Sequence, residues 1–439
     1  MRPSRFHVLE ELSEFSPVEL AALARGRRGL LFFDSAREGA GSGEASLLAL
    51  EPNEVLEGDL FEEGGFERLR SVVLREQERE WVDDGLPGPI VAGGVRYDGR
   101  YWFGVYSQVL LYRHAEEKWY GSGDWWRGLL EEGERLRQAP QGVEPWEGRL
   151  DFRSQLSKES FCEMVRRAQA YIAAGDIYQV NLSHVLEAHW AGGDPWPVYE
   201  ALRHLSPAPY GAFLDLGPGP GVLLSTSPEL FLQFSGRVIR TRPIKGTRPR
   251  RADPLADERS AFDLITSPKE VSELVMITDL ERNDLGQVCE WGSVSVRELL
   301  KLERHEQVFH LVSTVEGRLR PEVDGVTALR ACFPGGSITG APKRRAREII
   351  AELEPHRRGW YTGVVGWFGA RGESQFSILI RTMEFQGGVA RFCVGAGVVA
   401  DSVPEQEWQE TWDKAAGLLL AARWRGQERW TWVGGGGSP

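Results

Sequence analysis

Short apolar runs separated by turn residues dominate the first third of the chain, a pattern that predicts β-strands. The runs that we expect to form strands are residues 30–34, 46–50, 90–97 and 102–112. Residues 125–137 predict a helix with one polar face. No grouping of acids, bases or metal ligands stands out here, so we expect residues 1–137 to have a structural or regulatory role.

Composition along the chain predicts where this first region ends. Residues 138–153 are rich in Pro, Gly and Gln and predict a linker. The glycine run at Gly434–Gly437 predicts a disordered tail over residues 426–439. Residues 154–425 would then form a second, larger domain, and most of the candidate chemistry lies in it.

The second domain opens with a helix and then a strand whose two faces differ. Ser157 can cap a helix over residues 157–174, and residues 176–183 then alternate polar and apolar side chains. Gln179 and Asn181 share the polar face of that strand. Such a face usually meets solvent, but if the strand is central in its sheet, Gln179 lines a site.

Residues 242–248 place one lysine, Lys245, at a stiff corner of the chain. Pro243 predicts the end of a strand or a bulge, and Gly246 allows a turn. Lys245 could be an ordinary surface charge or a point charge for an anion. If its ammonium group is desolvated, it could also be an amine nucleophile.

A single carboxylate, Glu229, lies in the apolar run that follows residue 222. A carboxylate in such surroundings must be paired or have a raised pKa, and a raised pKa is what a general acid needs near neutral pH. A structural glutamate that caps a helix or forms an ion pair fits the segment equally well.

Two pairs of glutamates share a three-residue spacing. Glu270 and Glu273 lie at the start of one helix, and Glu407 and Glu410 at the start of the last one. Paired carboxylates on two helices suit a hard cation such as Mg²⁺. The plainer alternatives are a helix cap and a salt-bridge stripe. Residues 279–286, which are densely charged, predict a structural turn after the first of these helices.

Basic and glycine-rich positions in the last third indicate anion binding. Arg381 ends a buried apolar strand and needs an anion, for which a substrate carboxylate would serve. The glycines of residues 393–399 let a ligand approach the backbone. The glycine loop of residues 333–344 opens a helix whose N–H groups can bind an anion. His310, within an apolar strand, is typical of a core residue.

Charge and cysteine content exclude several classes of protein. The net charge is −12 and no basic stretch stands out, which argues against a general nucleic-acid binder. The four cysteines are far apart and form no CxxC pair, which is typical of reduced thiols in the cytosol. No secretion signal and no apolar run of about 20 residues is present, so we expect a cytoplasmic protein without a membrane span.

Eight motifs from about residue 157 to 422 occur in the order of a known family. They are DIYQVNLS, SPELFL, RPIKGTRPR, DLERNDLG, FPGGSITGAPK, IRT, GAGVVADS and EWQETWDK. This half resembles the chorismate-binding domain of chorismate-utilising enzymes, which include anthranilate, aminodeoxychorismate, isochorismate and salicylate synthases. The resemblance implies an α/β (α+β) fold like that of anthranilate synthase component I, with mixed or antiparallel sheets in a layered sandwich with outer helices. Residues 1–137 resemble that family's N-terminal region more weakly.

The resemblance also implies roles for individual residues. Glu273 and Glu410, with Glu270 and Glu407 nearby, match the Mg²⁺ ligands, and Glu229 matches the general acid that protonates the departing C4 hydroxyl. The positions that match the binding site for chorismate are Arg381, Tyr361, Gly395, Ala396, Gly397 and the supporting Lys414, with His310 and Ser337 near the reacting ring.

Two positions separate the branches of the family. Isochorismate and salicylate synthases have a lysine where this chain has Gln179, which argues against both activities. Anthranilate synthases usually have alanine where this chain has Lys245, whereas aminodeoxychorismate synthases have the lysine. The resemblance therefore implies 4-amino-4-deoxychorismate as product, on the way to 4-aminobenzoate and folate, with anthranilate synthase component I as the alternative. Ammonia would come from a separate glutamine amidotransferase subunit. Residues 47–51 only loosely match the tryptophan-binding motif, so we expect no strong inhibition by tryptophan.

Overall fold

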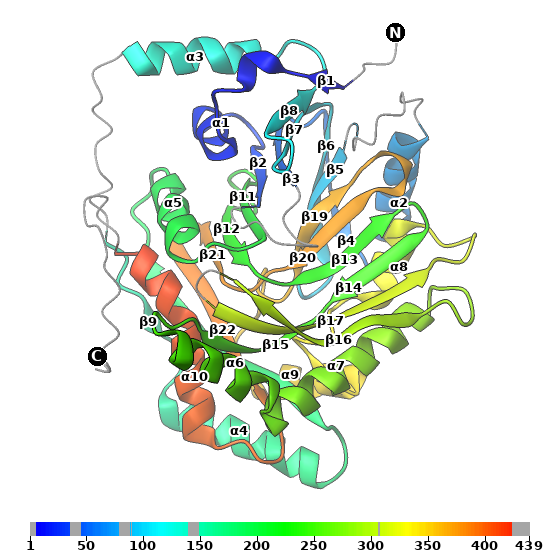
Figure 1. Ribbon diagram of the computed structural model, residues 1–439, viewed down its shortest axis with the longest axis vertical. Coiled ribbons are helices and arrows are strands. Elements are labelled where there is room, and N and C mark those ends of the chain that lie inside the picture. The colour runs from blue at the N-terminus through cyan, green and yellow to red at the C-terminus, as the bar shows by residue number, and fades with distance from the viewer. Residues whose placement is uncertain are drawn as a thin grey trace.

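The computed structural model describes residues 6–35, 45–78, 88, 90–138, 149–305 and 308–423. Most of the predicted linker and all of the predicted tail therefore lie outside the described residues. Two antiparallel sheets, with helices around them, make up the described part of the chain (Figure 1). The antiparallel sheets and outer helices confirm the expected fold class.

The larger sheet brings together strands from both ends of the chain. Its order is β1 (His7–Val8), β8 (Lys118–Gly121), β7 (Gln108–Arg113), β3 (Ala45–Leu50), β2 (Leu31–Asp34), β11 (Tyr210–Asp215), β12 (Val222–Ser227), β21 (Thr382–Gln386), β22 (Val389–Val398), β10 (Gln179–His189) and β18 (Gly340–Ala341), with β9 (Arg153–Ser154) on β10. β10 is thus an inner strand, because β22 and β18 flank it.

The second sheet, also antiparallel, likewise combines strands from early and late parts of the chain. Its order is β15 (Ile244–Pro249), β17 (Val308–Arg318), β14 (Val238–Arg242), β13 (Leu230–Ser235), β20 (Ser374–Ile378), β19 (Val364–Phe368), β5 (Ile90–Val95), β6 (Arg100–Tyr106) and β4 (Glu54–Asp59), with β16 (Ser295–Arg304) on β17. The pairings of β2 with β11 and of β5 with β19 join early and late strands in each sheet. The segment boundary predicted at residues 138–153 therefore does not separate one sheet from the other.

The helices lie mostly at the two ends of the sandwich (Figure 1). They are α1 (Pro17–Leu23), α2 (Glu63–Gln77), α3 (Arg127–Gln138), α4 (Lys158–Ala173), α5 (Trp196–Leu205), α6 (Pro254–Ile265), α7 (Pro268–Gly286), α8 (Gly325–Cys332), α9 (Lys343–Leu353) and α10 (Pro404–Ala421), with 3-10 turns at Glu10–Leu12 and Ala370–Gly372. α10 packs on β22 and α7 on β17, which brings the two helices with paired glutamates beside strands of both sheets. None of the described helices has the length and apolar composition needed to cross a bilayer.

The prediction of a turn at residues 279–286 is wrong, because α7 continues to Gly286. Two of the charged positions belong to a buried helix face, whereas Asp279 and Arg282 are exposed and pair with each other. Glu281 and Asp284 are only 3% and 2% exposed and lie beside the buried Leu285. Their partners come from other segments, the backbone N–H of Gly336 for Glu281 and Lys343 for Asp284. Charge density marked an interior polar contact here, not the end of the helix.

Candidate active site

The inner strand β10 and its neighbour β22 form the floor of the site. Asn181 lies opposite Gly397 and Ser183 opposite Gly395 in the strand register. Gln179 is fully buried, which favours the site-lining alternative for this face over the solvent-facing one. Neither polar atom of its carboxamide has a hydrogen-bond partner in the described part of the chain. A side chain at Gly397 would come within 2.8 Å of Gln179 Nε2, so glycine leaves this floor open.

Lys245 projects toward that floor from β15. β14 ends at Arg242 and β15 starts at Ile244, so the predicted interruption at Pro243 is confirmed. The Lys245 side chain is 16% exposed, and its Nζ lies 3.7 Å from Glu273 Oε2. The same Nζ lies 3.5 Å from where a Cβ on Gly397 would be. Lys245 is therefore an interior lysine, which removes the surface-charge alternative.

Glu229, the predicted general acid, is a buried carboxyl with a raised pKa. It lies in the short connection between β12 and β13 and is 5% exposed. Burial raises its pKa, while the Ser337 side chain and the Lys245 ammonium group act in the opposite direction. The backbone N–H of Ile244 also contacts its carboxylate. Glu229, Ser337 and Lys245, predicted separately, are thus brought together.

The two pairs of glutamates lie on α7 and α10, and each glutamate lies against a cation. The pairs are Glu270 with Arg248 (3.3 Å), Glu273 with Lys245 (3.7 Å), Glu407 with Lys269 (3.2 Å) and Glu410 with Lys414 (2.7 Å). Burial raises the pKa of Glu273, Lys245 and Lys269 oppose that rise, and Glu270 and Glu410 add to it. The carboxylates on α7 and α10 are therefore close enough to repel one another.

Two buried oxygens in this group fit a divalent cation. Glu273 Oε1 and Glu407 Oε2 have no hydrogen-bond partner among the residues that the structure describes. Within the same residues, no three acidic, histidine or cysteine side chains already surround a common point. Mg²⁺ could be held by Glu273 and Glu410, with Glu270 and Glu407 in support, if these carboxylates turn away from their lysines and arginine.

The predicted carboxylate-binding residues come from several elements around β22. Lys414 Nζ donates to the carbonyl oxygen of Gly395 (2.9 Å), and a side chain at Gly395 would lie 2.8 Å from the Tyr361 hydroxyl. Ala396, between the two glycines, is buried. Arg381 lies in the connection between β20 and β21, next to Ile380, which packs against the buried cluster that contains Tyr361.

Arg381 has two features of a group that awaits a ligand. It is half-buried, and its backbone has a positive φ of 51°, which is uncommon outside glycine. Burial alone lowers its pKa, with no acidic neighbour in the described residues to oppose the effect. A guanidinium group in this setting suits the carboxylate of a bound ligand.

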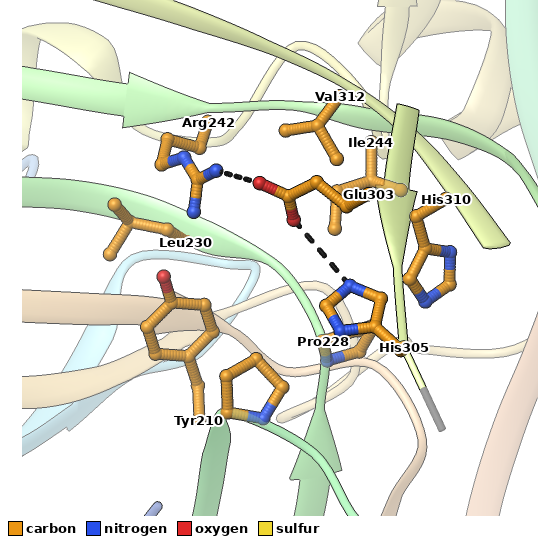
Figure 2. Close-up of a pocket in the computed structure, with 10 residues that line it drawn as sticks. Tyr210, Pro228, Leu230, Arg242, Ile244, Glu303, His305, His310 and Val312 are labelled. Atoms are coloured by element: carbon orange, nitrogen blue, oxygen red, sulfur yellow. Dashed lines mark hydrogen bonds and ion pairs between the residues drawn. The ribbon is translucent and has the colours of Figure 1, made fainter. Parts of the chain in front are cut away.

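His310, on β17, lies opposite Thr247 and not opposite Lys245. Its Nδ1 is 3.0 Å from Thr247 Oγ1, and in the strand register Leu311 is the residue opposite Lys245. Figure 2 shows His310 beside a small pocket of about 10 Å³. Its wall includes the ion pair of Arg242 and Glu303, and two more wall residues, Pro228 and Ile244, are the chain neighbours of Glu229 and Lys245. That His310 lies near a reacting ring stays a prediction.

Sequence reasoning missed two charged groups at the site. Lys269, in the first turn of α7, pairs with Glu407, and its place next to Glu270 in the sequence was the available signal. Arg358, only 1% exposed at its side chain, donates to the carbonyl oxygens of Asn181 (2.7 Å) and Ile338 (3.0 Å). It ties β10 to the glycine loop, and no local pattern marks it.

Comparison of the sequence and the fold with known proteins identifies the family of this chain. The model of the chorismate binding enzyme family matches residues 49–420. The chain belongs to the chorismate binding enzyme family. A solved structure, anthranilate synthase component I from Streptococcus pneumoniae, superposes with a TM-score of 0.74 at 30% identity, over 87% of this chain and 93% of that one. The menaquinone-specific isochorismate synthase of Escherichia coli has the same TM-score at 19% identity over 96% and 95%, which shows the shared fold alone.

Curated relatives of this family member have two different product names. Anthranilate synthase component 1 of Thermus thermophilus is 48% identical over 62% of this chain and 59% of its own length. Aminodeoxychorismate synthase component 1 of Bacillus subtilis is 45% identical over 62% and 57%. The chain thus spans less than three-fifths of the length of these relatives. Their nearly equal identity leaves the choice of product to the site residues.

Proposed function

We propose that this protein is the chorismate-aminating component of aminodeoxychorismate synthase, which makes 4-amino-4-deoxychorismate from chorismate and ammonia. The observation that supports this most is Lys245, an interior lysine 3.7 Å from Glu273 and facing the glycine floor of β22. A largely buried lysine that faces glycine backbone, where no side chain blocks a ligand, supports a role as nucleophile toward a bound ring. A lysine that served only as a surface charge would have no need of burial. The product would feed 4-aminobenzoate and folate synthesis in the cytoplasm.

The proposed reaction uses Lys245 and Glu229 in two displacement steps. The neutral amine of Lys245 forms a bond to C2 of chorismate, the ring double bond shifts, and the C4–O bond breaks. Glu229 gives its proton to the leaving hydroxyl, which departs as water. Ammonia then forms a bond to C4, the double bond shifts back, and the C2–N bond breaks. Lys245 is released as the amine, and the surplus proton on the new amino group returns to Glu229.

The remaining residues would bind and orient the substrate. Arg381, which has no acidic partner in the described chain, would pair with one chorismate carboxylate, and Tyr361 with the Gly395–Gly397 backbone would hold the other. Glu273 and Glu410 would hold a Mg²⁺ ion, which would supply positive charge for a substrate carboxylate. Gln179, in place of a lysine that could activate water, makes hydroxylation an unsuitable reaction for this site.

The source of ammonia is part of the proposal. The relatives that match are called component 1, and we propose a glutamine amidotransferase subunit as the partner that delivers ammonia. In its absence, ammonium salts at mildly alkaline pH would supply the nucleophile. Dependence on added ammonia, with little use of glutamine by the isolated chain, is the expected behaviour.

Anthranilate synthase component I is the alternative, favoured by the 48% identity to the Thermus thermophilus relative. Incubation with chorismate, ammonia and Mg²⁺ distinguishes the two. Aminodeoxychorismate keeps its enolpyruvyl group and yields 4-aminobenzoate only after a lyase is added, whereas anthranilate forms directly and fluoresces strongly. Direct formation of anthranilate would overturn the proposed product, and the absence of any chorismate turnover would overturn the proposed activity.

A further inference from the structure

A second buried carboxyl, Glu281, lies next to the general acid on the inner face of α7. It is 3% exposed, although nothing in the proposed reaction uses it. The backbone N–H of Gly336 donates to Glu281 Oε1 (3.1 Å), and the hydroxyl of Thr241 donates to Oε2 (3.5 Å). Glu281 therefore bridges the glycine loop and β14, two segments far apart in the sequence.

Both segments that Glu281 bridges continue directly to Glu229. Gly336 precedes Ser337, whose side chain lies against Glu229. Thr241 lies on β14, just before the interruption at Pro243 and the Ile244 N–H that also contacts Glu229. Glu281 and Glu229 thus both contact the glycine loop and the segment from Thr241 to Ile244. A shift of Glu281 would therefore move the groups that contact Glu229.

The far side of the glycine loop is held separately. Arg358 donates to the carbonyl oxygen of Ile338 (3.0 Å), while Thr339 closes its own turn by donating to the carbonyl oxygen of Gly335 (2.8 Å). On the α7 side, a side chain at Gly336 would lie 2.6 Å from Leu280, so the backbone there is pressed onto the helix. In the described structure, Glu281 is the polar side chain of α7 that bonds to this loop at Gly336.

Burial and the charges around Glu281 determine its pKa. The facing titratable groups are Asp284 on the same helix, Lys343 on α9, Cys332 on α8 and Glu229. Burial raises the pKa of Glu281 to about 8, Asp284 and Glu229 add to the rise, and Lys343 opposes it. Because Lys343 pairs directly with Asp284 (2.5 Å), Glu281 is the member of the pair that keeps its proton at neutral pH.

We infer that Glu281 is a positioning residue for the reaction: it ties the glycine loop to β14 and so holds Ser337 and the Ile244 N–H against Glu229. The inference rests on the proposed role of Glu229 as general acid. Ionisation of Glu281 would strengthen the two hydrogen bonds that it accepts, but it would also place a further negative charge beside Asp284 and Glu229 with Lys343 as the cation that balances them. The repulsion between Glu281 and Glu229 would then displace the bridge from its place beside the acid.

Two substitutions separate the geometry of Glu281 from its charge. Glu281→Gln keeps the shape and the acceptor for Gly336 but cannot ionise. Glu281→Leu keeps the volume but removes both bonds. Glu316→Gln serves as the matched control, because Glu316 is a largely buried, ion-paired glutamate on β17 whose partners are Arg240 and Arg297. Steady-state kinetics with chorismate are measured from pH 6 to 9.5 at a constant concentration of neutral ammonia.

We expect Glu281→Leu to lower kcat about 100-fold with little change in the KM for chorismate, because a misplaced acid and not substrate contact is affected. Glu281→Gln should keep kcat within about threefold at pH 7 and lose the decline that the wild-type protein shows as the pH rises through about 8. Glu316→Gln should match the wild type throughout. An unchanged kcat in Glu281→Leu, or a wild-type decline in Glu281→Gln, would overturn the inference.

A measurement without turnover keeps this inference separable from the proposed function. Glutamate labelled with ¹³C at the side-chain carboxyl reports the titration of Glu229, assigned by its loss in Glu229→Gln. Glu281→Leu should raise the pKa of Glu229 further, because Ser337 and the Ile244 N–H no longer stabilise its charged form, whereas Glu281→Gln should leave it unchanged. An unaltered Glu229 titration in Glu281→Leu overturns the positioning role even if chorismate is not the substrate. A wild-type protein that does not turn over chorismate overturns the proposed function alone.

Discussion

Lys245 Nζ and Glu273 Oε2 lie 3.7 Å apart, and this contact joins the proposed nucleophile to a proposed metal ligand. Each residue is therefore the other's partner until ligands bind. A Glu273 carboxylate that turned toward a bound cation would give up this contact with Lys245. The first prediction tests this lysine.

Lys245→Ala should reduce formation of aminodeoxychorismate at least about 1,000-fold, the order expected when the nucleophile of a covalent mechanism is lost. Lys301→Ala, at an exposed lysine of β16, is the matched control and should keep wild-type activity. Intact mass spectrometry of wild-type protein during turnover should show a chorismate-derived adduct that Lys245→Ala lacks. Aminodeoxychorismate formation by the alanine variant at the wild-type rate would exclude Lys245 as nucleophile.

Removal of one carboxylate from either helix should abolish Mg²⁺-dependent turnover. Glu273→Gln and Glu410→Gln each take away a charged oxygen ligand that a hard cation requires, so turnover should be lost at any Mg²⁺ concentration. Glu290→Gln, at a half-buried glutamate beyond the end of α7 that pairs with Arg237, should titrate with Mg²⁺ like the wild type. The metal site is elsewhere if both site variants show the wild-type Mg²⁺ dependence.

Lys269→Met should strengthen Mg²⁺ binding several-fold. The Lys269 ammonium group lies 3.2 Å from Glu407 Oε1 and competes with a metal ion for that carboxylate. Isothermal titration of the protein with MgCl₂, without substrate, measures the affinity directly. Lys158→Met, at the exposed start of α4, should leave it unchanged. Weaker or unaltered Mg²⁺ binding in Lys269→Met would mean that this lysine does not occupy the metal position.

Arg381→Met should raise the KM for chorismate about 10- to 100-fold, since a hydrogen-bonded charged contact to a carboxylate is lost. The same change should raise the melting temperature of the free protein, because a cation without an acidic partner in the described structure is replaced by an apolar side chain. Differential scanning calorimetry and initial-rate kinetics measure the two effects. An unchanged KM together with a lower melting temperature would assign Arg381 a purely structural role.

Stability should fall between about pH 4 and pH 8 in a way that depends on Glu281. Its pKa in the folded protein is about 8, above the value of about 4.3 in an unfolded chain, so the folded state holds a proton that the unfolded state has released. The unfolding free energy contributed by Glu281 is therefore full below pH 4 and is lost progressively up to pH 8. Urea unfolding at pH 5 and pH 8 should show a smaller difference for Glu281→Gln than for the wild type. An equal difference would mean that Glu281 does not hold this proton.

Local pattern predicted those parts of the fold that depend on neighbouring residues. The helix expected at residues 157–174 is α4, because Ser157 caps it through the Ser160 N–H, a contact within one turn. The interruption at Pro243 followed from the missing N–H of proline. By contrast, the pairing of β5 with β19 joins distant segments, and no local signal encodes it. The charged end of α7 was misread because its partners, at Gly336 and Lys343, come from later in the chain.

The candidate site shows the same division. The glutamate spacing on each helix was visible in the sequence, but the cation beside each carboxylate was not, since those pairs cross between elements. Gln179 could be placed on a strand face, whereas its burial depends on β22 and β18 lying on either side of β10. The contact of Ile380, the neighbour of Arg381, with the cluster that contains Tyr361 joins segments that only the folded structure brings together.

The late pairing of early strands has a consequence for the growing polypeptide. β2 and β5 are each flanked in the finished sheets by strands that are synthesised much later, β11 and β19. Until those segments leave the ribosome, each early strand has one backbone edge with unpaired N–H and C=O groups, and such edges attract other chains. The glycines at Gly93 and Gly94, in the middle of β5, lower its strand propensity during this interval. The nascent chain is thus most prone to aggregate before β19 is made, and slower translation over that stretch would favour mispairing between copies.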